Sequence, residues 1–314
     1  MIARLRQFAA RALRGGDGRV RATWRTLLPA AVVFLLGAAL LPALVLSALE
    51  PGPVLGHPLG NATSVAIALG VLALTARYLD RRPIADYGLD LDRDWAAQFT
   101  VGAVAATLLV GLAWALARAA STATVVGTLS AGDAGSLLGG LALFAAGWLC
   151  VGVWEEVTFR GLLLTNAAEG LAARGLPSGR ALGGAWLVST VLFALVHAPT
   201  STVPGDASLV GMLAVWGLAG GLLGLAYVLT GRLAAPVGGH FAFDLAVNNL
   251  LFAPTSAGTA LPAVVRTTVG GSALFHPIGG LPMLAALLAG YALAGGWWLL
   301  RRRENTTTRS VAGA

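Results

Sequence analysis

The sequence predicts an all-α integral membrane protein with about eight transmembrane helices and both termini in the cytoplasm. Of its 314 residues, 57% are hydrophobic and only 11% are charged, and the mean hydropathy is +0.78. A soluble domain of this length could not hide so much apolar surface behind a charged exterior. The composition therefore excludes a soluble enzyme, a disordered chain and, because there is a single cysteine, a disulfide-linked scaffold.

Apolar segments recur along the chain, and most approach the roughly 20 residues that a helix needs to cross a bilayer. Helices are expected because an unpaired backbone polar group is too costly in lipid. One segment contains the overlapping pairs Gly217/Gly221 and Gly220/Gly224, a spacing that lets helices approach closely. The eight segments are 27–49, 61–78, 95–117, 137–164, 182–199, 209–229, 234–252 and 281–300.

The placement of arginine supports this topology. All 21 basic residues are arginines, and with both termini in the cytoplasm 19 of them fall on the cytoplasmic side. Only Arg118 and Arg266 fall outside, which is the bias expected from the positive-inside rule. Topology therefore explains the net charge of +7, and we expect the bilayer as a partner and no nucleic acid.

Three regions follow from this reading. Residues 1–26 form a basic arm with apolar residues on one helical face and arginines on the other. We expect the arm to lie on the anionic inner leaflet, with a disordered tail as the alternative. Residues 27–300 form the transmembrane domain, with a motif-bearing core at 137–252, and residues 301–314 form a cytoplasmic tail.

Polar residues between the segments are expected to have structural roles. Asp90, Asp92 and Asp94 precede the third segment, where they would cap the helix and lie in a solvated loop. His57 and His276 are expected in outer loops.

Charged residues inside the hydrocarbon cost roughly 3 kcal/mol each, so the few that occur there are candidates for function. Glu156 and Arg160 are four residues apart, in the favourable order for a helical ion pair. Glu155 lies on a different face, and an unpaired carboxylate in a low dielectric suits a general base. The alternative is that both glutamates serve a structural network with Arg160.

Two histidines accompany these glutamates. His197 ends the fifth apolar segment, and His240, Asp244 and Asn248 share one stripe of the seventh. A lone membrane histidine is often only a hydrogen-bond partner between helices. Two histidines, a carboxylate stripe and the unpaired Glu155 together favour a common site.

These clusters resemble the motifs of the CAAX-protease and bacteriocin-processing (CPBP, or Abi) family of intramembrane endopeptidases. The family pattern is EExxxR, FxxxH and HxxxN or HxxxD, and the sequence has these in the same order. The resemblance implies hydrolysis of a peptide bond, with Glu155 and His197 activating water and with His240 and Asp244 stabilising the oxyanion. It leaves the cofactor open, as none or as zinc bound by Glu155, His197 and His240.

The other motif positions have supporting roles in this resemblance. Glu156 and Arg160 would hold the first motif in place. Position 244 is often asparagine in the family, and Asp244 can donate to an oxyanion only when it is protonated. Otherwise Asp244 would orient His240, or Asn248 would supply the donor.

The depths of two of these residues predict a particular helix geometry. Glu155 lies about 27 Å inward from the outer start of its segment, and His197 about 22 Å outward from the inner start of its own. Straight, perpendicular helices would not bring the two side chains together. We therefore expect tilt and an overlong fourth helix.

The leading hypothesis is an intramembrane endopeptidase acting on a membrane-accessible peptide or protein. The lack of lysine indicates GC-rich coding, which favours a multi-pass protein of a bacterial plasma membrane. The alternatives are a non-catalytic membrane scaffold or regulator, and a small proton-coupled transporter. The sequence has no convincing inverted repeat, which weighs against the transporter. It leaves the substrate and the oligomeric state open.

Overall fold

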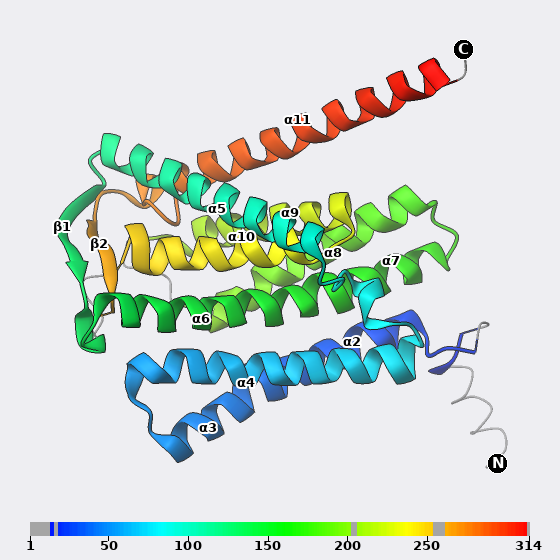
Figure 1. Ribbon diagram of the computed structural model, residues 1–314, viewed down its shortest axis with the longest axis horizontal. Coiled ribbons are helices and arrows are strands. Elements are labelled where there is room, and N and C mark those ends of the chain that lie inside the picture. Colours follow the sequence, from blue (N-terminus) through cyan, green and yellow to red (C-terminus); the bar gives the residue numbers. More distant parts are fainter. Residues whose placement is uncertain (1–12, 16–17, 202–205, 254–260, 313–314) are drawn as a thin grey trace.

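Long antiparallel helices give the molecule two ends, with a small sheet at one of them (Figure 1). The computed structural model describes residues 13–15, 18–201, 206–253 and 261–312. Seven of the described helices are long and apolar enough to cross a membrane, which confirms the all-α, polytopic class. They are Ala22–Leu49, Gly52–Asp80, Arg93–Ala119, Leu137–Ala172, Ser178–Thr200, Leu209–Thr230 and Leu281–Leu300.

Three of these spans combine α-helical and π-helical stretches, and the others are α-helical throughout. The composite spans consist of α2 (Ala22–Val32), η1 (Val33–Leu40) and α3 (Leu41–Leu49); α4 (Gly52–Leu74) and η2 (Thr75–Asp80); and α6 (Leu137–Glu156), η5 (Val157–Leu164) and α7 (Thr165–Ala172). The others are α5 (Arg93–Ala119), α8 (Ser178–Thr200), α9 (Leu209–Thr230) and α11 (Leu281–Ala312). Short 3₁₀ turns are η3 (Ile84–Tyr87), η4 (Gly132–Ala134) and η7 (Ala273–Phe275).

The eighth predicted segment is also helical, formed by α10 (Ala234–Leu245) and the π-helical η6 (Ala246–Leu251). It is not among the seven candidate spans, and much of α10 is buried within the bundle against α5. Two glycines allow this approach. A Cβ on Gly238 would lie 2.1 Å from the carbonyl oxygen of Phe99, and one on Gly102 would lie 2.2 Å from that of Ala235.

A two-stranded antiparallel sheet closes one end of the bundle, and the sequence analysis did not predict it. The strand β1 (Ala123–Ser130) follows α5, and β2 (Ala263–Val269) precedes α11, with Ala123 paired to Val269. We call this end the sheet end. We call the opposite end, which carries the turns at 80–93, 173–180 and 231–233, the arginine end.

Two of the arginines counted on the cytoplasmic side, Arg25 in the arm and Arg160, are buried in the structure. The helix α2 begins at Ala22, so Arg25 belongs to the bundle, where it is buried and pairs with Asp80 at 2.9 Å. Arg160, counted with the cytoplasmic arginines, is likewise fully buried. Most of the predicted amphipathic arm lies outside the described residues. The last helix continues to Ala312, past the predicted start of the tail.

Candidate active site

One long helix carries the first motif. The elements α6, η5 and α7 form a continuous span of 36 residues, which confirms the predicted overlong fourth helix. Glu155 and Glu156 are its last two α-helical residues before the π-helical η5, a type of helix that occurs frequently at functional sites. All residues from Trp154 to Leu164 are buried, so this stretch lies inside the bundle and away from lipid.

Glu156 binds two partners with the same oxygen. Arg160 Nη1 donates to Glu156 Oε1 at 2.8 Å, which confirms the predicted ion pair, and both side chains are fully buried. His240 Nδ1 also lies 2.8 Å from Glu156 Oε1. Arg160 Nη2 donates in addition to the carbonyl of Gly220, in one of the glycine pairs noted in the sequence. The Glu156–His240 bond was not predicted.

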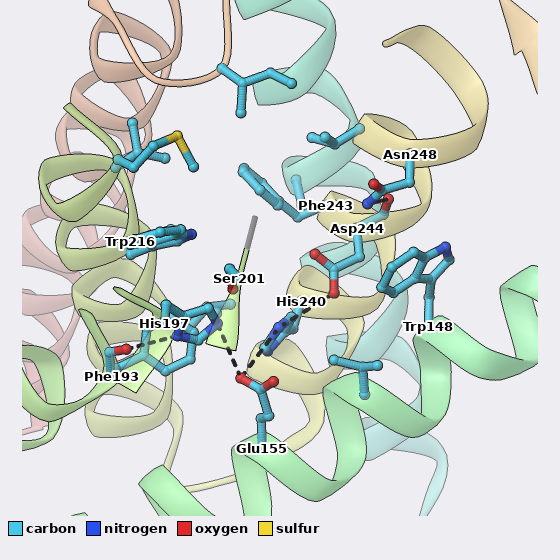
Figure 2. A pocket seen from close by; sticks show the side chains of 18 of the residues that line it. Trp148, Glu155, Phe193, His197, Ser201, Trp216, His240, Phe243, Asp244 and Asn248 are labelled. Atoms are coloured by element: carbon cyan, nitrogen blue, oxygen red, sulfur yellow. Dashed lines mark hydrogen bonds and ion pairs between the residues drawn. The ribbon is translucent and has the colours of Figure 1, made fainter. Parts of the chain in front are cut away.

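Glu155 faces the two histidines. Its Oε2 lies 3.7 Å from His197 Nε2 and 3.9 Å from His240 Nε2 (Figure 2). Oε2 is buried and has no hydrogen-bond partner in the described part of the chain. These distances are too long for direct hydrogen bonds, and one water molecule lying beside the gap in the cavity can bridge Glu155 to an imidazole.

The hydrogen bonds of the imidazoles fix which nitrogen each ring presents. His197 Nδ1 lies 2.7 Å from the carbonyl oxygen of Phe193. A carbonyl can only accept, so Nδ1 carries a proton and the neutral ring presents an Nε2 lone pair towards Glu155. The carboxylate of Glu156 accepts a hydrogen bond from His240 Nδ1, which directs Nε2 of His240 into the same space, where it can donate when both ring nitrogens are protonated.

The third motif contributes one further group to this cluster. Asp244 Oδ2 lies 3.5 Å from His240 Nε2. Asn248 donates its amide to the backbone carbonyl of Asp244 at 2.9 Å and lies one helical turn farther along the wall (Figure 2). The structure therefore places Asp244 beside His240 and leaves Asn248 on the periphery.

All of these groups except the buried Glu156–Arg160 pair line a cavity of about 1040 Å³. Its wall also holds aromatic residues, among them Trp148 and Trp216 (Figure 2). His57 lines the same cavity, which corrects its predicted position in an outer loop. Its ring stacks on Phe144 with centroids 4.8 Å apart.

The reason for the error at His57 is that α4 begins at Gly52, nine residues before the predicted segment. Pro53, at the first turn of this helix, was the sequence signal for the earlier start. His276 does lie in a loop, as predicted, but it is buried and accepts a hydrogen bond from the backbone N–H of Gly279 at 3.0 Å. Burial lowers the pKa of His276.

The fit of a metal ion can be judged from the donor set. Two imidazoles and a carboxylate are ligand types that zinc accepts. In the described ranges, however, no three His, Cys, Asp or Glu side chains are grouped so as to hold a metal ion. We therefore derive no chemical step through a metal ion.

The fold is that of a multi-pass membrane protein, and the segment that carries the three motifs is similar to a known protein family. Residues 137–246 match the family described as type II CAAX prenyl endopeptidase Rce1-like, which confirms the resemblance over just over a third of the chain. No curated protein and no solved structure matches the chain. The family match indicates a CAAX-type intramembrane endopeptidase.

Proposed function

We propose that this protein hydrolyses a peptide bond within the membrane, using a water molecule held between Glu155 and His197. The observation that carries the proposal is the position of Glu155 Oε2, which is buried, without a partner in the described chain and 3.7 Å from an imidazole lone pair. A buried acceptor in such a place is normally satisfied by water. The match of residues 137–246 to a peptidase family supports peptide hydrolysis as the reaction.

The proposed reaction needs one base and one route for the proton. Glu155 accepts a proton from the bound water while His197 Nε2 orients it, and the water oxygen bonds to the scissile carbonyl carbon. The carbonyl electrons move to oxygen and form a tetrahedral oxyanion. When this intermediate collapses, the C–N bond breaks and the leaving nitrogen takes the proton from Glu155.

The oxyanion is stabilised by the His240–Asp244 pair in this proposal. Donors that are already in place where negative charge develops contribute strongly to catalysis in a water-poor site. Glu156 fixes the ring of His240 through Nδ1, and Arg160 balances the charge of Glu156. These two residues are positioning residues, because they act through His240. Asn248 is the alternative donor.

The setting of the reaction completes the proposal. We place the protein in the plasma membrane of a bacterium, with both termini in the cytoplasm and residues 137–252 as the core of the transmembrane domain. Its partners are the bilayer and a peptide or protein substrate, and no nucleic acid takes part.

A comparison of membrane proteomes tests this function. Cells with the wild-type protein and cells with Glu155→Gln are compared for new N-terminal and C-terminal peptides. Glu50→Gln is the matched control, because Glu50 is an exposed glutamate at the end of α3. We expect cleavage products in the wild type and the control that are lost in Glu155→Gln. Identical peptide sets in all three would favour a scaffold and contradict the proposal.

A further inference from the structure

The cavity reaches only one end of the molecule. From Glu155 it extends to Thr200 and Ser201 at the end of α8 and to Thr268 and Val269 of β2, all at the sheet end. Among the described residues, its lining includes none from the turns that form the arginine end. The cavity therefore opens towards the sheet end.

The opposite side of Glu155 is closed by packing. The helix that continues from Glu155 towards the arginine end is buried on all sides as far as Leu164. Beyond the ion pair of Glu156 and Arg160, a second buried layer joins Arg25 to Asp80. Both layers are made of side chains that would have to lose buried ion pairs before a peptide could pass, which is costly.

The groups at the mouth suit a polypeptide. The hydroxyls of Thr200 and Thr268 donate to the carbonyls of Val196 and Thr124, so their oxygens can accept from a peptide N–H, and Ser201 supplies a third hydroxyl. Thr268 and Val269 are exposed although they line the cavity, so they mark its rim. Among the described residues that line the cavity at this end, none carries a charge, so this part of the lining suits an uncharged stretch of chain.

The distribution of arginine indicates on which side of the membrane each end of the molecule lies. The turns of the arginine end carry Arg81, Arg82, Arg93, Arg174, Arg180 and Arg232, whereas Arg118 and Arg266 are near the sheet end. By the positive-inside rule the sheet end is extracytoplasmic.

We infer that the substrate is an uncharged polypeptide segment on the extracytoplasmic side of the membrane, which passes between Thr200 and Thr268 to reach Glu155. The inference rests on the proposed function and assigns its substrate to one side of the membrane. A segment confined to the cytoplasmic side is not a substrate.

Single-cysteine variants test this route. Cys150, the only cysteine, is first replaced by alanine, and Thr268→Cys, Thr128→Cys or Ser178→Cys is then introduced separately. Thr268 lies at the rim, Thr128 is exposed on β1 away from the cavity, and Ser178 is exposed at the arginine end. Each variant is treated with a bulky, membrane-impermeant maleimide in right-side-out and in inverted vesicles, and cleavage is then measured.

The route predicts that Thr268→Cys and Thr128→Cys react only in right-side-out vesicles and Ser178→Cys only in inverted ones. Labelling should abolish cleavage in Thr268→Cys and leave it unchanged in Thr128→Cys. Labelling of Thr268→Cys only in inverted vesicles, or full cleavage after its labelling, would overturn the inference. Failure of the proposed function is distinguishable, because it would show as a lack of cleavage by the unlabelled Cys150→Ala parent protein, in which Thr268 is unchanged.

Discussion

Glu156 Oε1 lies 2.8 Å from His240 Nδ1, and this hydrogen bond joins α6 to α10 across 84 residues of sequence. The same oxygen binds Arg160, so one carboxylate both balances a buried guanidinium and fixes an imidazole. The first and third motifs therefore form one unit. A change at Glu156 should affect folding and chemistry together, whereas a change at Glu155 should affect chemistry alone.

Glu156→Gln should destabilise the protein by about 3–5 kcal/mol, because it leaves Arg160 as an uncompensated buried charge. Chemical unfolding in detergent measures the effect, with Glu50→Gln as the control. The double variant Glu156→Gln/Arg160→Met removes the orphaned charge, so it should regain stability but not cleavage, since His240 still lacks its carboxylate. A single variant as stable as the wild type would contradict the assignment.

Asp244→Asn should retain or increase cleavage if the residue donates to the oxyanion, because an amide donates at any pH whereas a carboxyl group must be protonated. The rate is measured with purified protein in vesicles. Asn248→Ala is the companion variant and should have little effect, because the amide of Asn248 is bound to the carbonyl of Asp244. An inactive Asp244→Asn protein would rule out the donor role.

Gly102→Ala should destabilise the bundle, because the added methyl group would lie 2.2 Å from the carbonyl oxygen of Ala235 on α10. Overpacking of this kind costs about 1–3 kcal/mol. Gly111→Ala is a matched control on the same helix, since a Cβ there meets no atom within 4 Å. Thermal unfolding in detergent compares the two, and equal midpoints would show that α5 and α10 are not packed this closely.

We expect Asp92 to make a pH-dependent contribution to the stability of the fold. It caps α5 as expected from the sequence, and its oxygens accept hydrogen bonds from Arg232 at 2.6 and 3.0 Å. The hydrogen bonds from Arg232 and from the Trp95 backbone lower the pKa of Asp92 from 3.8. Because the folded pKa is the lower one, this stabilisation is present above pH 3.8 and is lost as the pH falls through the folded value.

The measurement for Asp92 is a pair of unfolding curves. The midpoint of Asp92→Asn should lie below that of the wild type at pH 7, and the two should converge in acid. A difference that persists unchanged at a pH well below the folded pKa would contradict the assignment.

The sequence predicted the features that depend on local spacing. Glu156 and Arg160 are one helical turn apart, so their pairing could be derived from the helical period. The cap at Asp92 follows from its place before an apolar run. The meeting of Glu155 and His197 was expected from the motifs, and their depths then required an overlong fourth helix, which the structure confirms.

Features that depend on how distant helices pack could not be derived in this way. The Glu156–His240 bond depends on the register of α10 against α6, where a Cβ on Gly152 of α6 would lie 3.0 Å from the carbonyl oxygen of Val237 on α10. The pairing of β1 with β2 joins segments about 140 residues apart. His57 was misplaced because the apolar run that marked the second segment begins at 61, whereas α4 begins at Gly52.

The most direct test of the account is the cleavage rate of Glu155→Gln, measured with purified protein in vesicles on a peptide identified from the membrane proteome. Removal of the general base should reduce the rate about 10²–10⁴-fold, while the unfolding midpoint stays at that of the wild type. Glu50→Gln should cleave at the wild-type rate. A Glu155→Gln protein that cleaves as fast as the wild type would contradict the central claim that Glu155 activates the attacking water.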